Sequence, residues 1–224
     1  METNTTVAGA SALDNLEISA QALNTPRKRK QFIKGLAVAS VGMAAATAIP
    51  ASVMAAGSKA AVPASDIAIL NFALTLEHLE ARFYDAALGV VPFEQNIVRA
   101  LAQTLKTDEN AHVAALTAAL KSVGGSAVGP APSYNFGADT FKTQSGFLKL
   151  ARLLEDTGVH AYLGQAANIK TPSILLTAAS IVTVEGRHAG AIRYQYGLAP
   201  TISPFDGGYT KEKVLSIAGP LIGM

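Results

Sequence analysis

Two short stretches of the sequence pair a glutamate with a histidine three residues later. DENAHVAAL contains Glu109 and His112, and VEGRHAGAI contains Glu185 and His188. In an α-helix, residues i and i+3 project from the same side, so each pair can direct a carboxylate and an imidazole toward one point. Exposed Glu–His pairs that support isolated helices are the alternative. The apolar residues that flank both pairs contradict exposure and predict helices with the pairs on a buried face.

Two further glutamates lie on apolar stripes at helical spacing. Glu77 shares its stripe with Leu70 and Leu74, and Glu155 shares its stripe with Leu148 and Val159. An isolated buried carboxylate costs several kcal/mol, so four of them in one core require protons, cationic partners or a metal. Arg152 and Arg187 are the only arginines near these glutamates in the sequence, and they are too few. The pattern therefore indicates a metal site.

The ligand types narrow the choice of metal. Four carboxylates and two imidazoles, with no cysteine in the chain, suit iron or manganese, although affinity alone would not exclude zinc or copper. Two ions held by bridging carboxylates, with one histidine each, would leave coordination positions open for oxygen or peroxide. We expect two iron or manganese ions, bound by Glu77, Glu109, His112, Glu155, Glu185 and His188.

Apolar periodicity and Pro/Gly punctuation predict four long helices, at about residues 66–88, 93–123, 143–168 and 172–197. The first and third connections are short, whereas residues 124–141 form a long Gly/Pro-rich crossover, GGSAVGPAPSYNFGADTF. An all-α four-helix bundle with one long crossover between helices two and three has this layout. A Pro/Gly-rich tail and a short amphipathic helix, at about residues 211–218, follow the bundle.

The first 56 residues have the composition of an export leader. The basic segment PRKRKQFIK, residues 26–34, precedes a long uncharged run with small residues near Val53 and Ala55, as in a cleaved signal peptide. RKQFIK is similar to the twin-arginine signal, with Lys30 in place of the second arginine and Ile33 in place of leucine. An uncleaved membrane anchor is the alternative. We expect a leader at residues 1–56, a bundle at 57–197 and a C-terminal extension at 198–224, exported to the periplasm or secreted without a membrane span after cleavage.

Charge and composition exclude several classes of partner. Outside the leader the chain has 13 basic and 13 acidic residues, so a nucleic-acid partner has no electrostatic support. The absence of cysteine rules out disulfides, thiolate zinc sites, thiol catalysis and a lipoprotein anchor.

At these residues the sequence resembles the ferritin-like superfamily, over roughly residues 64–197. LNFALTLEHLEARFYDAAL, DENAHVAAL and LEDTGVHAYLGQAA look like the exported ferritin-like domain family that includes desiccation-related proteins. The resemblance implies that Glu109 and Glu185 bridge two metal ions, that Glu77 and Glu155 are terminal ligands, and that Tyr84 is the aromatic residue seven positions after the first ligand. Glu77 to Glu109 spans 32 residues and Glu155 to Glu185 spans 30, so we interpret the two hairpins as pseudo-repeats.

Some residues depart from the superfamily pattern. Glu80 is a substitute ligand or a group next to the ligands, and we favour Glu77 as the ligand from its place in the stripe. His160 follows Glu155 by five residues, so we expect it to be packed or hydrogen-bonded rather than a ligand, and, like Glu80 and Tyr84, it is a candidate for a group next to the ligands. We expect His78 on the surface. We expect Tyr162, Tyr194 and Tyr196 to be core aromatics. Gly158 and Gly186 suggest close helix contact near the metals.

Two classes of function remain open. The first is a di-metal oxidoreductase of ferroxidase, peroxidase or catalase type, which would react with oxygen or peroxide in iron oxidation or oxidative-stress defence; catalytic residues beyond the ligands are unknown. The second is a non-enzymatic envelope protein that protects during desiccation and keeps a structural metal site. A smaller oligomer is possible, but the leader, the tail and the lack of an acidic lining argue against a 24-subunit storage cage.

Overall fold

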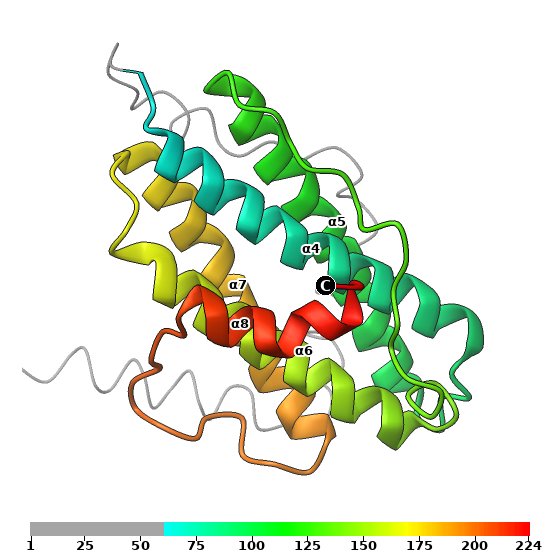
Figure 1. Cartoon of the computed structure of the whole chain (residues 1–224). Helices are drawn as coiled ribbons and strands as arrows, with labels where there is room; N and C mark the ends of the chain where they lie inside the picture. The colour runs from blue at the N-terminus through cyan, green and yellow to red at the C-terminus, as the bar shows by residue number, and fades with distance from the viewer. Residues whose placement is uncertain (1–60) are drawn as a thin grey trace, which may run out of the picture. The chain divides into compact units, whose positions relative to one another are not determined.

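The computed structural model describes residues 61–224, which form an all-α bundle (Figure 1). Its long helices are α4 (Ala64–Val90), α5 (Asn96–Ser122), α6 (Gln144–Ala166) and α7 (Pro172–Gln195). The short helix α8 (Lys211–Ala218) and a 3₁₀ turn, η1 (Gly219–Leu221), end the chain. No strand occurs in this part of the chain. The predicted class, with a long crossover after the second long helix and a short C-terminal helix, is confirmed.

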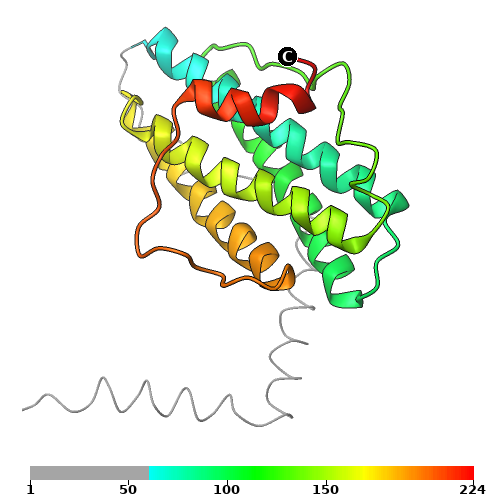
Figure 2. The ribbon, with the colours of Figure 1, turned by 60° about the horizontal axis from the view of Figure 1, so that its bottom comes forward.

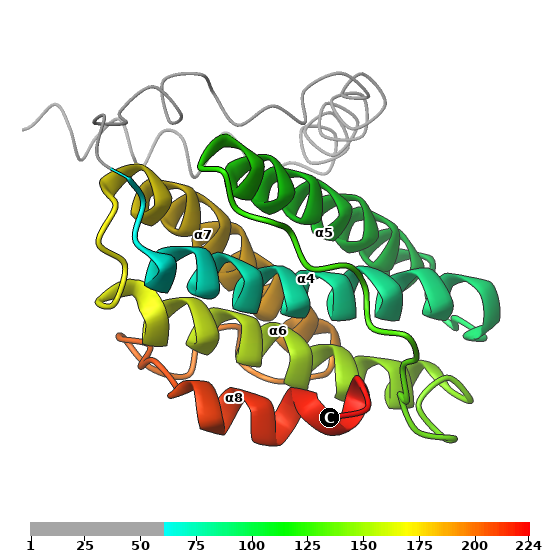
Figure 3. The ribbon, with the colours of Figure 1, turned by 45° about the horizontal axis from the view of Figure 1, so that its top comes forward.

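Successive long helices pair as two antiparallel hairpins, α4–α5 and α6–α7, and the hairpins face each other through α4 with α6 and α5 with α7 (Figure 3). Local signals set where the helices begin. The hydroxyl of Thr143 accepts the backbone N–H of Gly146 at 3.0 Å and so caps α6. Pro172 occupies the first turn of α7, where its missing N–H has no helical partner to lose.

The crossover between α5 and α6 returns along the outside of α4 (Figure 3). The side chain of Asn71 fixes it at one point, since its amide donates to Ser126 O at 3.0 Å and its carbonyl accepts Val128 N–H at 2.8 Å. His78 lies about two turns further along α4 and contacts Val128 O at 3.3 Å. The crossover thus takes the chain back along the bundle before the second hairpin begins.

The tail after α7 turns back along α6 and leads into α8, which lies across α4 and α6 (Figure 2). Tyr209 N–H donates to His160 O at 2.8 Å. The tail passes so close to α6 that a Cβ on Gly164 would lie 1.8 Å from Tyr209 O, so this position requires glycine. Val214 and Ala218 of α8 are buried in the same core as Phe72. The tail and α8 are therefore part of the bundle's packing.

Two apolar clusters fill the bundle, one toward each end. The first includes Phe83, Leu105 and Phe147, and the second includes Leu74 and Leu116. Along α4 and α5, the glutamates at positions 77 and 109 fall between residues of the two clusters. The sequence therefore places a polar layer between two apolar layers, where water is excluded from it.

The predicted leader, residues 1–56, lies outside the described residues, so export, the twin-arginine route and cleavage stay predictions. Between residues 61 and 224, no helix is both long and apolar enough to cross a membrane.

Candidate metal centre

Every residue that the sequence predicts as a metal ligand lies in one cluster inside the bundle. The four glutamates are fully buried, and the two histidines are 8% and 5% exposed. Their oxygen and nitrogen atoms form two groups, in each of which one atom per residue lies within 4.8 Å of the others. The first group is Glu77, Glu109, His112 and Glu185, and the second is Glu109, Glu155, Glu185 and His188.

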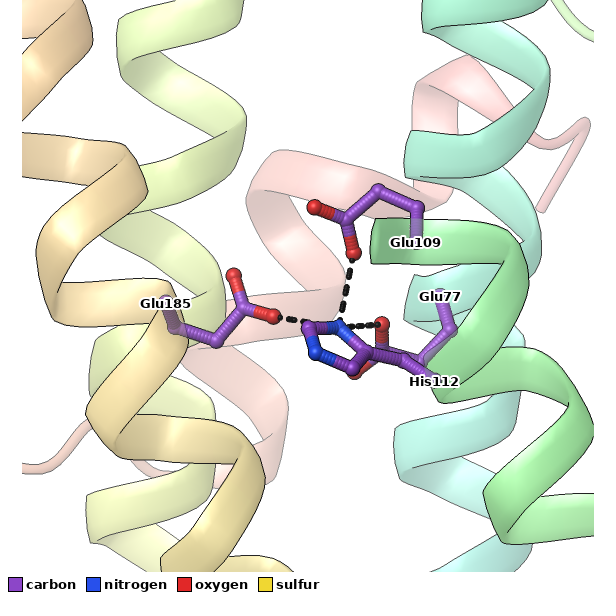
Figure 4. A group of neighbouring side chains, drawn as sticks. All are labelled: Glu77, Glu109, His112 and Glu185. Carbon is purple, nitrogen blue, oxygen red and sulfur yellow. Dashed lines mark hydrogen bonds and ion pairs between the residues drawn. The ribbon is translucent and has the colours of Figure 1, made fainter. Parts of the chain in front are cut away.

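The first group surrounds Nδ1 of His112, as Figure 4 shows. This atom lies 3.2 Å from Glu77 Oε2, 3.0 Å from Glu109 Oε2 and 2.9 Å from Glu185 Oε1. The three carboxylates come from α4, α5 and α7, so the group joins the two hairpins.

The second group surrounds Nδ1 of His188 in the same way. This atom lies 2.9 Å from Glu109 Oε1, 3.5 Å from Glu155 Oε2 and 3.8 Å from Glu185 Oε2. The two imidazole rings are 6.0 Å apart, centroid to centroid.

Glu109 and Glu185 belong to both groups, and each divides its two oxygens between the histidines. Glu109 directs Oε2 to His112 and Oε1 to His188, while Glu185 directs Oε1 to His112 and Oε2 to His188. Glu77 and Glu155 each belong to one group only. The cluster thus consists of two shared carboxylates, two unshared carboxylates and one imidazole on each side.

Several buried atoms of the cluster have no hydrogen-bond partner among residues 61–224. They include both oxygens of Glu185, Oε1 of Glu109, Oε2 of Glu155 and Nδ1 of His188. Such orphaned groups normally cost free energy, and a cation at the point where they converge would satisfy them together. Oxygen and imidazole donors without thiolate suit iron or manganese. The cluster can therefore bind metal ions.

The electrostatics of the cluster agree with this fit. Burial raises the pKa of Glu109 to about 7, against the opposing effect of the His112 and His188 imidazoles beside it. Burial and the other carboxylates also raise the pKa of Glu185. Burial would lower the pKa of His112, but its contacts with Glu109, Glu185 and Glu77 outweigh burial and raise that pKa to about 12. Without a metal, the cluster holds its surplus negative charge by binding protons.

No arginine neutralises the cluster in the described part of the chain. Arg193 forms an ion pair with Asp156 at 2.8 Å, and Arg152 lies 3.6 Å from the same carboxylate. Arg187 is exposed. The expectation that too few arginines lie near the glutamates to neutralise their charge is confirmed for residues 61–224.

Each unshared glutamate accepts a hydrogen bond from a tyrosine of the opposite hairpin. Tyr84 on α4 donates to Glu155 on α6, and Tyr162 on α6 donates to Glu77 on α4 at 2.5 Å. Burial, followed by the charge of the glutamate that each hydroxyl contacts, raises the pKa of both tyrosines, so both stay protonated and can donate. Tyr162 is a core aromatic, as predicted, but its hydroxyl also positions a glutamate. Tyr162 follows Glu155 by seven residues, just as Tyr84 follows Glu77. This equal spacing is the sequence signal that could have identified Tyr162 as a partner of a ligand glutamate. The prediction that Tyr194 is a core aromatic is wrong, because Tyr194 is 67% exposed, whereas Tyr196 is partly buried against the core.

Asp108 was not identified from the sequence. Its Oδ2 lies 3.1 Å from Nε2 of His188, on the side of the ring away from the cluster. A carboxylate there fixes the orientation of the ring and makes Nδ1 a better ligand. In residues 61–224, Nε2 of His112 has no such partner, so the two halves of the cluster are not equivalent.

Glu80 lies beside the cluster and is 2% exposed, but it belongs to neither group of four. His160 lies away from the cluster, because its ring stacks on Tyr209 at 4.3 Å between centroids and contacts Gly207 O in the tail. His160 is therefore hydrogen-bonded and packed, as expected, but the expectation that it is a group next to the ligands is wrong, because its ring faces the tail. His78 is partly exposed beside the crossover.

The sequence predicts close helix contact at Gly158 and Gly186, and this prediction is correct at Gly158 only. A Cβ on Gly158 would lie 3.2 Å from Glu80 Oε1, so this glycine makes room beside the cluster. The prediction for Gly186 is wrong, because Gly186 is exposed and a Cβ there would meet nothing within 4 Å. Gly186 lies next to Glu185 in sequence but on the outer face of α7.

Comparison with known proteins finds a family and a shared fold. Residues 65–198 match a family described as the ferritin-like domain. A crystal structure of a conserved hypothetical protein, rv2844, from Mycobacterium tuberculosis shares the fold, with a TM-score of 0.54 and 20% identity. The similarity covers 64% of this chain and 98% of that one. No curated protein matches the chain.

Proposed function

Because the chain belongs to the ferritin-like domain family, we propose that the cluster binds two iron or manganese ions and reacts with oxygen or peroxide. The sharing of Glu109 and Glu185 between the two histidines carries this proposal. Two groups with two carboxylates in common are the arrangement that a pair of ions held by bridging carboxylates requires.

The proposal gives each ligand a role. Glu109 and Glu185 would be shared by the two ions, Glu77 and His112 would hold one ion, and Glu155 and His188 would hold the other. Four carboxylates balance the charge of two divalent ions, which explains how the bundle core can contain so many acidic groups. When bound, the metal pair supplies electrons to the oxidant and stabilises the negative charge that develops on it.

The other residues of the site prepare the ligands. Tyr84 and Tyr162 hold one oxygen of Glu155 and Glu77, which leaves the second oxygen of each for a metal. Asp108 holds the ring of His188. The apolar layers on both sides keep bulk water out, which strengthens every electrostatic interaction within the cluster. The residues thus arrange a fixed ligand set in a dry interior.

The place of action is proposed from composition alone. The basic segment at residues 26–34 and the uncharged run after it support export to the periplasm or secretion, with residues 57–224 as the mature chain. N-terminal sequencing of protein from the envelope fraction would then find a chain that begins near residue 57. A chain that still begins at Met1 in that fraction would contradict cleavage.

Oxidation of ferrous iron and consumption of peroxide test the activity. The full chain, loaded with iron or with manganese, is compared with a Glu109→Ala, Glu185→Ala double variant and with Glu94→Ala, an exposed control in the connection just before α5. We expect one of the two reactions in the wild type and in the control, and its loss in the double variant. A loaded wild type that carries out neither reaction would contradict the oxidoreductase and favour a structural metal site in a stress-protection protein.

A further inference from the structure

A small pocket enters the bundle between α4 and α6 and is lined by residues of all four long helices. Ile69 of α4 and Gln165 of α6 are partly exposed and lie at its mouth. Leu116 of α5 is fully buried and Ala178 of α7 is 8% exposed, so these two lie at its inner end. The pocket therefore passes through the layer of α4 and α6 toward the axis of the bundle.

The inner end of the pocket lies close to the candidate metal centre along the helices. On α5, Leu116 follows His112 by four residues, and on α6, Tyr162 follows Glu155 by seven. At the helical rise, these spacings are about 6 and 10 Å. Tyr162 also belongs to both places, since its ring lines the pocket and its hydroxyl donates to Glu77 at 2.5 Å. A single side chain thus connects the wall of the pocket with a predicted ligand.

The walls of the pocket suit a small apolar molecule. Of the residues that line it, only Gln165 and Tyr162 have a polar side-chain group, and the hydroxyl of Tyr162 is already bonded to Glu77. The volume of about 20 Å³ is enough for one molecule of about the size of water. Apolar cavities stay dry and take up apolar molecules instead. Hydrogen peroxide would lose its hydrogen bonds in this pocket, whereas dioxygen has none to lose.

We propose that this pocket binds dioxygen and is the side from which dioxygen reaches the metal pair. The role of the pocket rests on the proposed di-metal function and deepens it, because it selects dioxygen rather than peroxide as the oxidant. Dioxygen enters between Ile69 and Gln165 and is held against Leu116 and Ala178, beside Tyr162. Interior side chains change rotamer even in a close-packed core, which lets a diatomic molecule cross the last layer to the metals.

Dioxygen itself is the probe in the first experiment, because it is paramagnetic and broadens the NMR signals of nearby methyl groups. The full chain is loaded with zinc, which accepts the same donors and has no redox chemistry, and is compared under oxygen and nitrogen pressure. We expect oxygen to broaden the methyl signals of Leu116 and Ala178 several-fold more than those of Leu105. Leu105 is as deeply buried on α5 but belongs to the other apolar cluster. Equal broadening of Leu116 and Leu105 would overturn the binding site.

A variant that narrows the pocket tests its role in the reaction. Ala178→Val adds two carbon atoms at the inner end, and Ala179→Val adds the same atoms at the next, exposed position of α7. The iron-loaded, reduced full chain is mixed with dioxygen or with peroxide. We expect Ala178→Val to keep two iron ions and to react with dioxygen about tenfold more slowly. Any reaction with peroxide should be unchanged, and Ala179→Val should match the wild type with both oxidants.

The outcomes separate the oxygen pocket from the proposed function. An unchanged rate with dioxygen in Ala178→Val, or equal slowing with both oxidants, would overturn the route if two irons are bound. If Ala178→Val does not fold or loses iron, the methyl signals of the wild type still decide whether dioxygen occupies the pocket. A wild type that binds no iron, although dioxygen broadens Leu116 selectively, would contradict the proposed function and not the pocket.

Discussion

The hydroxyl of Tyr162 on α6 donates a hydrogen bond to Glu77 on α4 at 2.5 Å, across the two hairpins. Tyr84 and Glu155 make the reverse connection. Each hairpin therefore orients one unshared glutamate of the other. The repeated spacing of glutamate and tyrosine in the two hairpins thus corresponds to two matching hydrogen bonds at the candidate metal centre.

Removing the Tyr162 hydroxyl tests this link. In Tyr162→Phe, Glu77 loses a buried donor, so we expect the metal-free protein to lose about 1–3 kcal/mol of unfolding free energy. Metal affinity should fall about tenfold or more, because Glu77 is no longer oriented. Urea denaturation and metal titration measure the two effects. Tyr194→Phe is the control, since Tyr194 is 67% exposed on α7; equal losses in both variants would contradict a specific role for Tyr162.

Asp108 supports one histidine only, so its loss should affect one metal site. In Asp108→Asn, His188 keeps its ring in the cluster but loses the carboxylate at Nε2. We expect the affinity of one of the two ions to fall about 10–100-fold while that of the other changes little. Calorimetric titration resolves the two sites. Asp139→Asn, whose side chain is exposed, should behave as the wild type, and an equal loss at both sites would contradict the assignment.

Metal binding should release protons. The pKa of about 12 at His112 means that its imidazole is protonated at neutral pH without metal, and a ligand imidazole must be neutral. Protons therefore compete with the metal, and affinity should rise with pH, by about tenfold per unit for each proton released. Titration calorimetry in buffers of different ionisation enthalpy counts these protons. Binding heats that are the same in every buffer would show that no proton leaves.

Asp66 joins the start of α4 to the loop between α6 and α7. It is fully buried and accepts the backbone N–H groups of Lys170 at 3.1 Å and Thr171 at 2.7 Å. Burial opposes its ionisation, but hydrogen bonds from Thr171 and Lys170 outweigh burial and lower its pKa below 3.8. We expect Asp66→Ala to lose about 1–3 kcal/mol of unfolding free energy at pH 7.

The pH dependence of this difference has a definite sign. A carboxyl with a lowered pKa in the folded state contributes stability above its unfolded pKa, and that contribution is lost as pH falls through the folded value. The gap between wild type and Asp66→Ala should therefore be constant from pH 7 to about 5 and should narrow below pH 3.8. Urea denaturation at each pH measures the gap. A gap that widens toward low pH would contradict this role.

The sequence was sufficient to predict the bundle and the cluster of six residues. Glu109 and His112 were recognisable because their spacing and their apolar flanks both follow the helical period. The same period correctly separated His160 and His78 from the cluster. Long helices with short hairpin connections leave few ways to arrange four apolar faces, so positions on the stripe translate directly into positions in the core.

The residues that support the ligands could not be predicted in the same way. Asp108 is adjacent to Glu109 in sequence and therefore points about a quarter-turn away, and only the packing of α7 brings His188 next to it. The space beside Glu80 depends on how closely α4 approaches α6 at Gly158. Close helix contact was also expected at Gly186, but that glycine is exposed. Such contacts depend on helix rotation and separation, which periodicity does not determine.

Metal content tests the central claim most directly. Protein purified without chelators is analysed by plasma mass spectrometry beside the Glu109→Ala, Glu185→Ala variant and the Glu94→Ala control. The account predicts about two iron or manganese ions per chain in wild type and control, as two sites that share carboxylates require, and their loss in the double variant. The double variant should remain folded, because it loses buried carboxylates that need a partner. A folded wild type that neither contains nor takes up metal would contradict the account.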